Sequence, residues 1–152
     1  MPTPLEWTAK EIYEVDGLAS MRDLARKLAD RIRGKSAVFA MHGDLGAGKT
    51  TFTQFLAAAL GVTRPVTSPT FTLVSEYPLP DGGLLVHMDL YRLRSGDDLD
   101  ALGFDEYIQG GALVFIEWAE RAEDSLPADT IHMTIDLDPE SADKRVVTLE
   151  TR

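Results

Sequence analysis

The chain has 152 residues, of which 44% are hydrophobic and 26% charged, which suits one domain over residues 1–152 with a real hydrophobic core. The absence of cysteine excludes disulfides and thiol-rich metal sites, and no apolar run is long enough to span a membrane. The formal net charge of -10 argues against a lone, tight nucleic-acid binder, because binding to a phosphate backbone depends mostly on Lys and Arg.

The first part of the chain predicts a strand and then an amphipathic helix. Residues 5–15 favour the strand, Asp16 is placed to act as the N-cap of the helix, and Gly34 ends the helical pattern. The apolar side chains at helical spacing are Leu18, Met21, Leu24, Ala25, Leu28 and Ile32. Such a stripe is typical of a helix that packs on a core.

The next segment carries the pattern around which the chain is organised. Residues 43–50, Gly-Asp-Leu-Gly-Ala-Gly-Lys-Thr, fit G-x-x-x-x-G-K-[ST], the phosphate-binding loop of nucleotide hydrolases and kinases. A buried parallel strand is predicted before the loop, over residues 37–41, and a helix that stops at Gly61 is predicted after it. The alternative, a glycine-rich turn with a stray lysine, would not explain this strand–loop–helix setting.

Each residue type in the loop has a physical reason to be there. Glycine admits positive φ, so that successive N–H groups can point into one concavity. Lys49 supplies positive charge for the β- and γ-phosphates, and the Thr50 hydroxyl is placed to ligate Mg²⁺. The residues predicted to bind the nucleotide are Gly43, Asp44, Leu45, Gly46, Ala47, Gly48, Lys49, Thr50 and Thr51.

The rest of the chain predicts a mixed sheet. Turn residues over 78–83 join two strands that we expect to pair antiparallel, and two alternating segments near the C-terminus predict a closing pair. The expected strands cover residues 71–77, 84–88, 112–116, 130–137 and 145–149, with a short helix between 95 and 103. We therefore predict an α/β, P-loop NTPase-like three-layer fold with a mixed, mainly parallel sheet and antiparallel C-terminal strands.

Two of the buried strands end in a carboxylate, namely Asp89 after residues 84–88 and Glu117 after residues 112–116. Ligands of open α/β sheets collect at the carboxyl ends of the strands. A phosphate-loop hydrolase needs an acid there to hold Mg²⁺ and a group to orient the attacking water. The alternative is that each acid only ends a strand at the surface. His87, in the same segment, is interpreted as a core or strand-end histidine rather than a metal ligand.

Four blocks of the sequence resemble the TsaE family, the ATPase subunit of the bacterial machinery that makes threonylcarbamoyladenosine in tRNA. The blocks are residues 43–52, Ser68-Pro69-Thr70-Phe71, His87-Met88-Asp89-Leu90-Tyr91-Arg92 and Glu117-Trp118, in the order and spacing of the family. Ala119 stands where many members have Pro, which leaves Glu117 and Trp118 in place.

The resemblance implies ATP and Mg²⁺ as cofactors and Lys49, Asp89 and Glu117 as catalytic residues, with Thr50, Glu117 and Asp89 around the metal. It also implies a switch-like or partner loop that includes Ser68 and Thr70, and a functional tryptophan at Trp118. The family acts with a TsaB–TsaD heterodimer, so the resemblance implies a protein that meets tRNA only through that complex. The absence of cysteine favours a cytoplasmic location, and no membrane contact is expected. Residues 16–20 are the candidate for contacts with adenine.

Other classes of nucleotide-binding protein share the loop. A small kinase that phosphorylates a metabolite would need an acceptor pocket and usually a lid, and the chain has no long polar or Arg-rich insertion. A guanine nucleotide switch would need an Asn-Lys-x-Asp run, which is not in the sequence. A nucleotide-sensing module would not need two acids. No motif marks an arginine for the transition state among Arg64, Arg92, Arg94 and Arg121, so we expect hydrolysis that is slow without a partner.

Overall fold

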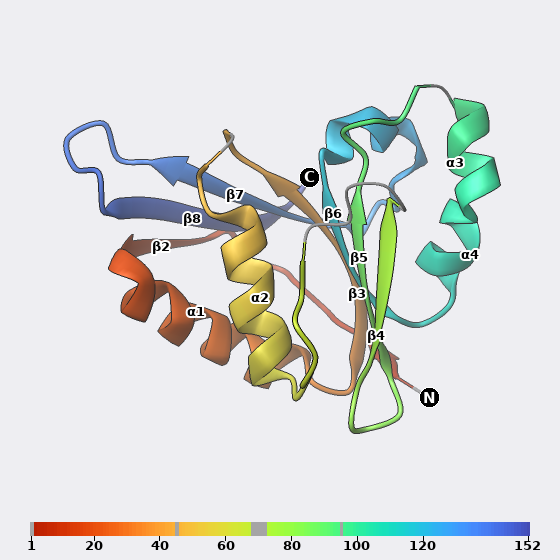
Figure 1. The fold of residues 1–152 in the computed structure, drawn as a ribbon, viewed down its shortest axis with the longest axis horizontal. Helices are drawn as coiled ribbons and strands as arrows, with labels where there is room; N and C mark the ends of the chain where they lie inside the picture. Colours follow the sequence, from red (N-terminus) through yellow and green to blue (C-terminus); the bar gives the residue numbers. More distant parts are fainter. Residues whose placement is uncertain (1, 45, 68–72, 95) are drawn as a thin grey trace.

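The computed structural model describes residues 2–44, 46–67, 73–94 and 96–152, and its centre is a sheet of eight strands (Figure 1). The strand order is β2-β8-β7-β3-β6-β5-β4, and β1 pairs with β3 beside this path. The strands are β1 (Thr3–Pro4), β2 (Glu11–Asp16), β3 (Lys35–His42), β4 (Val74–Pro78), β5 (Leu84–Asp89), β6 (Leu113–Glu117), β7 (Ile131–Leu137) and β8 (Lys144–Thr151). The helices are α1 (Gly17–Ile32), α2 (Lys49–Ala59), α3 (Gly96–Leu102), α4 (Phe104–Gln109) and the 3-10 segment η1 (Ala119–Ser125).

The sheet is parallel at its centre and antiparallel at both sides. Strand β3 runs parallel to β6 and β7, and β5 runs parallel to β6. The hairpin pair β4–β5 is antiparallel, and so are β7–β8 and β2–β8. This arrangement confirms the predicted mixed sheet with antiparallel C-terminal strands. It also brings the carboxyl ends of β3, β5 and β6 to one edge, toward the top of Figure 1.

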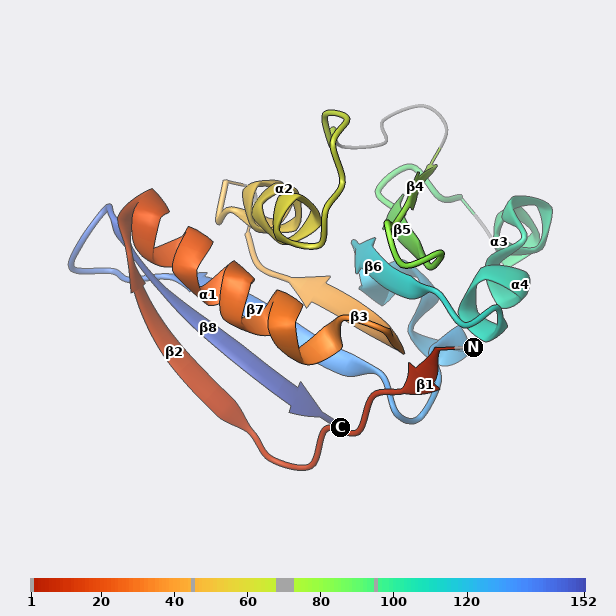
Figure 2. The ribbon, with the colours of Figure 1, turned by 90° about the horizontal axis from the view of Figure 1, so that it is seen from below.

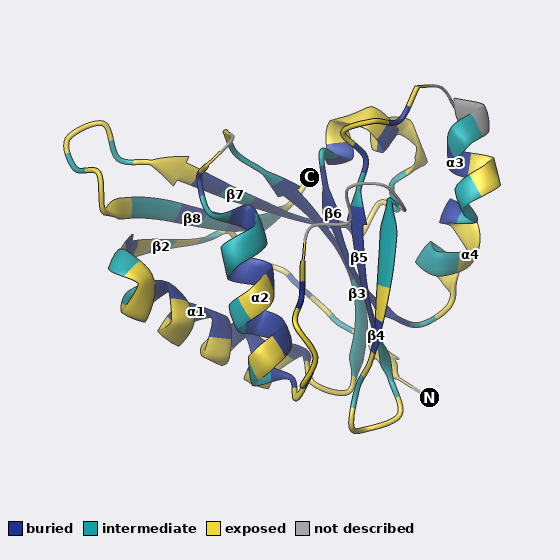
Figure 3. Ribbon diagram, viewed as in Figure 1, coloured by how far each residue is buried: buried dark blue, intermediate teal, exposed yellow. Residues whose placement is uncertain are grey.

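Helices cover both faces of the central strands, which confirms the three-layer prediction (Figure 2). Alternation along β3 explains why: Phe39 and Met41 join a core with α1 and α2, whereas Val38 and Ala40 join a core with α3, α4 and η1. The central strands are therefore buried along most of their length, while the outward sides of α1 and α2 are exposed (Figure 3). No described helix has the length and apolar character needed to cross a membrane.

Local details differ from the sequence-based expectations. The short helix expected between residues 95 and 103 is present as α3, and Gly103, with a φ of 78°, separates it from α4, a second short helix that the sequence did not predict. Asp16 occupies the N-cap position of α1, but its exposed side chain makes no capping hydrogen bond, and Gly17 N donates to Asp143 O instead. Strand β4 begins at Val74, after Leu73 with a φ of 62°, and the expected start at Phe71 lies outside the described residues.

The stacked rings of Phe39 and Phe115 predict a large stability effect. The two residues are register partners on β3 and β6. Their ring centroids are 4.6 Å apart, and both side chains are fully buried. We expect Phe39→Ala to lower the free energy of unfolding by about 3–5 kcal/mol, because it removes buried surface and leaves a cavity. Urea unfolding measures this, with Ile12→Ala, at a 61% exposed position, as the control that should change stability by less than about 0.5 kcal/mol. Equal losses in the two variants would contradict the assignment of the core.

Candidate functional site

The phosphate-loop motif forms the connection between the end of β3 at His42 and the start of α2 at Lys49. Gly43, Gly46 and Gly48 have φ values of 141°, 84° and 108°, which side-chain-bearing residues rarely adopt. Phe52 N donates to Gly48 O at 2.8 Å, so this is where the α2 hydrogen-bond pattern begins. The amides just before it lie at the positive end of the helix, where anions are favoured. Leu45 lies outside the described residues.

Lys49 is held at the base of this loop. Its Nζ donates to Gly43 O at 2.8 Å and lies 4.9 Å from the centre of the Trp118 ring, and the residue is 7% exposed. A positive charge so far removed from water is favourable only where negative groups or polar atoms surround it. The loop therefore presents a shielded ammonium to an incoming anion.

Thr50, in the first turn of α2, contacts the acid at the end of β6. Its Oγ1 lies 3.2 Å from Glu117 Oε1 and 3.1 Å from Glu117 Oε2. Glu117 is 5% exposed, and its Oε2 also lies 2.6 Å from Nε2 of the fully buried His87 on β5. Three elements that are distant in the sequence thus converge on one carboxylate.

Asp89 ends β5 beside Glu117, its partner in the parallel register. Leu90 N donates to Glu117 O at 3.0 Å, which ties the two strand ends together. The Asp89 Oδ1 accepts a hydrogen bond from Tyr91 N at 3.0 Å, and the Tyr91 ring packs on Trp118 with centroids 4.8 Å apart. The structure therefore places both predicted acids at the same edge, with Glu117 in direct contact with Thr50.

The oxygen atoms at this edge suit a hard cation. Thr50 supplies a hydroxyl, and Glu117 supplies a carboxylate within hydrogen-bond distance of it. In the described part of the chain, no group of three or more His, Cys, Asp or Glu side chains could enclose a metal ion. Mg²⁺ is usually held by one or two protein oxygens together with phosphate and water, so the residues present fit Mg²⁺ bound with a nucleotide.

Two hollows border the loop. One, of about 570 Å³, has Gly43, Asp44 and Trp118 in its wall. The other, of about 230 Å³, lies between the loop and the start of α1, with Leu18 and Met21 among the residues that line it. Leu18 belongs to the segment expected to contact adenine, and its side chain is 67% exposed.

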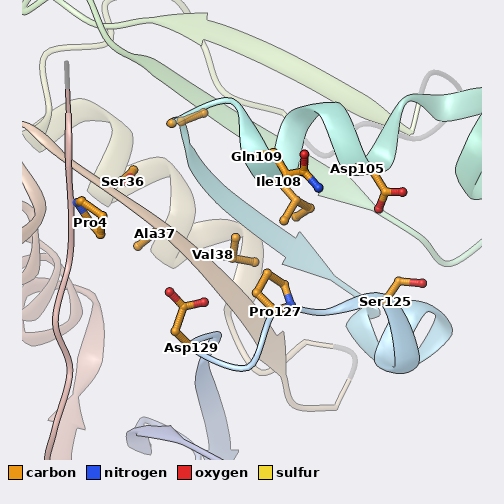
Figure 4. A pocket seen from close by; sticks show the side chains of 12 residues that line it. Pro4, Ser36, Ala37, Val38, Asp105, Ile108, Gln109, Ser125, Pro127 and Asp129 are labelled. Carbon is orange, nitrogen blue, oxygen red and sulfur yellow. The ribbon is translucent and has the colours of Figure 1, made fainter.

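A further cavity of about 470 Å³ lies at the opposite end of the sheet, near the amino end of β3 (Figure 4). Its described lining includes the carboxylates of Asp105 and Asp129 but no Lys, Arg or His. Negative charge without a balancing cation disfavours phosphate. This cavity is therefore poorly suited to bind an anion.

Other predicted site residues have separate positions. Ser68 and Thr70 lie outside the described residues. Among the candidate arginines, Arg64 donates to Glu76 O and lies over Tyr77, and Arg121 donates to Leu93 O at 3.4 Å. Trp118 has a φ of 58°, a left-handed conformation that turns the chain sharply after Glu117 and places the indole over Lys49.

Sequence reasoning missed two residues around the site. Strand alternation places His87 on the same face of β5 as Asp89, but its bond to Glu117 also requires that β6 be the neighbouring strand. Arg145 Nε donates to Ala47 O at 3.2 Å and so connects β8 to the loop. No sequence pattern signals that second contact, because it joins positions 98 residues apart.

Two stacked histidines lie behind the loop. His42 Nε2 and His132 Nδ1 are 2.8 Å apart, a distance that requires one of the two nitrogens to be unprotonated. Burial, together with the positive charges of Arg152 and His42, lowers the pKa of His132 to about 4. Burial also lowers the pKa of His42. The pair is therefore neutral at pH 7.

Comparisons by family model, by sequence and by structure all find similarity to the same family. The family model "Threonylcarbamoyl adenosine biosynthesis protein TsaE" matches residues 15–147. The tRNA threonylcarbamoyladenosine biosynthesis protein TsaE of Bacillus subtilis (strain 168) is 41% identical over 132 residues, which are 86% of this chain and 77% of that protein. The protein of the same name from Aquifex aeolicus is 46% identical over 110 residues, 71% of this chain and 74% of that protein. The crystal structure of YdiB from Bacillus subtilis matches with a TM-score of 0.76 at 32% identity, covering 96% of this chain and 88% of that one.

The close approach of β7 to the loop predicts that Gly43 is irreplaceable. A Cβ on Gly43 would lie 2.4 Å from Ile135 O, which is closer than real Cβ contacts. We expect Gly43→Ala to lower stability by about 3 kcal/mol and to abolish binding of a fluorescent ATP analogue. Gly34→Ala is the matched control, because Gly34 has a φ of 77° but nothing within 4 Å of its Cβ position. It should cost about 1 kcal/mol and leave binding intact. Binding by Gly43→Ala equal to that of the unsubstituted protein would contradict this geometry.

The lowered pKa of His132 predicts a loss of stability in acid. Unfolded histidine takes up a proton near pH 6.5, whereas folded His132 does so only near pH 4. The stability that depends on neutral His132 is thus fully present above about pH 6.5 and is lost as the pH falls toward 4. Urea unfolding at pH 7 and 4.5 should show that His132→Gln loses about 2 kcal/mol less between these pH values than the unsubstituted protein. An identical loss in both proteins would show that His132 does not titrate in this way.

Proposed function

The chain belongs to the TsaE family of threonylcarbamoyladenosine biosynthesis proteins, and from this membership we propose that residues 1–152 form one ATPase domain that serves tRNA modification. The observation that carries the proposal is the contact of Thr50 with Glu117 beside a phosphate loop. The match over residues 15–147 favours this function over a kinase that phosphorylates a metabolite.

We assign the binding of the triphosphate to the loop amides and Lys49. The amides at the start of α2 and the shielded Lys49 ammonium together offer donors and positive charge to the phosphate oxygens. Thr50 and Glu117 supply the oxygen atoms that would hold Mg²⁺, directly or through water. When bound, Mg²⁺ would neutralise the negative charge that develops on the phosphate oxygens during transfer of the terminal phosphoryl group.

The nucleoside fits the smaller hollow. This space of about 230 Å³ adjoins Thr51, which follows the phosphate-binding residues, and it is lined on one side by Leu18 and Met21. An apolar wall beside exposed backbone suits a flat base. We therefore propose that residues 16–20 contact adenine, and that Arg145 on the opposite side fixes the loop at Ala47.

Hydrolysis requires a water molecule in line with the terminal phosphate. We assign the orientation of this water to Asp89 or Glu117, which are register partners at the ends of β5 and β6. Either carboxylate can orient the water and accept its proton while the bond between the phosphorus and the bridging oxygen breaks. Arg64 and Arg121 bind main-chain carbonyls elsewhere in the fold. We propose that an outside group completes the site, supplied by a TsaB–TsaD heterodimer in the cytoplasm whose repeated turnover the hydrolysis supports.

This proposal predicts different effects of the two charged residues. Lys49→Ala should abolish ATP binding, whereas Glu117→Ala should retain binding and lower kcat by roughly 100-fold, because it removes a group needed mainly in the transition state. Nucleotide hydrolysis and formation of threonylcarbamoyladenosine in tRNA are measured with and without TsaB and TsaD. Glu14→Ala, which removes an exposed carboxylate on β2, is the control that should leave both unchanged.

The partner dependence is tested in the same assay. We expect slow hydrolysis by the isolated chain and at least about tenfold faster hydrolysis with the heterodimer, as for phosphate-loop sites that a partner completes. Equal rates with and without the heterodimer would contradict the proposal.

A further inference from the structure

We propose that His87 is a positioning residue for hydrolysis, which holds the Glu117 carboxylate in the orientation that faces Thr50. This inference rests on the proposed function, because it concerns how Glu117 is presented to Mg²⁺ and water. It assigns to a buried histidine a role that its place in the middle of an apolar strand does not suggest.

The geometry links three elements through one carboxylate. His87 is 0% exposed on β5, and its Nε2 lies 2.6 Å from Oε2 of Glu117 at the end of β6. The same carboxylate faces Thr50 Oγ1 of α2 at 3.2 and 3.1 Å. A carboxylate only accepts hydrogen bonds when it is ionised, so Nε2 of His87 is the donor.

Packing alone does not explain a histidine at position 87. Its neighbours Leu85, Val86 and Met88 on β5 are apolar and fully buried. Among the described residues, His87 Nδ1 is buried and has no hydrogen-bond partner, which costs stability that a leucine at this position would not cost. Within the described part of the chain, the favourable polar contact of the His87 side chain is the bond to Glu117, so this bond is the physical reason for a histidine at this position.

The Thr50 contact does not fix the carboxylate by itself. The hydroxyl has a single hydrogen and lies almost equally far from both Glu117 oxygens, while the last torsion of a glutamate side chain has a broad energy minimum. Among the described contacts, the imidazole of His87 lies within hydrogen-bond distance of Oε2, and its full burial in β5 restricts the movement of the ring. It therefore selects one orientation and leaves Oε1 available toward Thr50 and the metal. Partners of this kind typically change metal affinity or activity by 10–100-fold.

Two substitutions separate the hydrogen bond from the packing. His87→Leu removes the donor, and His87→Gln keeps an N–H donor close to the position of Nε2. In the presence of TsaB and TsaD, we expect His87→Leu to lower kcat for ATP about 10- to 100-fold with the ATP KM within about twofold, and His87→Gln to restore most of the rate. Val86→Ala, a loss of buried volume at the neighbouring position, is the control that should lower the melting temperature and leave kcat within about twofold.

A readout that does not depend on hydrolysis is the melting temperature with ADP and with ADP plus Mg²⁺. A ligand that binds only the folded state raises the melting temperature, and the rise is larger when the ligand binds more tightly. ADP alone should stabilise the unsubstituted protein and His87→Leu equally. The additional stabilisation by Mg²⁺ should shrink in His87→Leu and return in His87→Gln.

A double-mutant cycle with Glu117→Ala completes the test. If His87 acts through Glu117, His87→Leu should have no further effect on kcat once Glu117 is removed. Multiplicative effects, equal losses in His87→Leu and Val86→Ala, or an unchanged Mg²⁺ increment would overturn the inference. If Glu117→Ala lowers kcat and His87→Leu does not, only the role of His87 fails. If Glu117→Ala hydrolyses ATP like the unsubstituted protein, the proposed function fails and the role of His87 with it.

Discussion

The contact between Thr50 and Glu117 is the constraint on which the rest of the structure depends. It joins the first turn of α2 to the last residue of β6, and it can form only because β3 and β6 are neighbours in parallel register. The chain must also reverse direction between the end of β3 and the start of α2, and the glycines of the loop, with their positive φ values, allow this turn. A carboxylate as buried as Glu117 is stable only with such partners, so fold and site impose the same condition on these residues.

The buried polar groups of the core are also concentrated near the Thr50–Glu117 contact. The central strands are apolar on both faces because helices cover both, and polar side chains within this core are few. Three of the buried ones, Lys49, His87 and Glu117, gather at the carboxyl edge of the sheet. Antiparallel pairs lie at both sides of the central strands, and β8 contacts the loop through Arg145. Polar groups in this core are thus concentrated where a charged ligand would compensate them.

Much of this arrangement could be predicted from the sequence, because the signals are local. The loop glycines, the helical spacing after Thr50 and the apolar runs before Asp89 and Glu117 each follow from the chemistry of adjacent residues. What could not be predicted depends on tertiary contacts. The neutral His42–His132 pair joins residues 90 positions apart, and the hydrogen bond that gives His87 its proposed role depends on the neighbouring strand. The short helix that ends before Gly103 was predicted, but α4 was not, because its six residues are too few to show a helical apolar period.

Under the proposed function, a triphosphate and its metal bind between Lys49, Thr50 and the acids at the strand ends. The most direct measurement is a crystal structure with a nonhydrolysable ATP analogue and Mn²⁺ in place of Mg²⁺, since Mn²⁺ takes similar oxygen ligands and can be located by anomalous scattering. We expect an anomalous peak within about 2.5 Å of Thr50 Oγ1, on the Glu117 side of the loop. The terminal phosphate should lie at Lys49. A metal or triphosphate bound away from this edge of the sheet would contradict it.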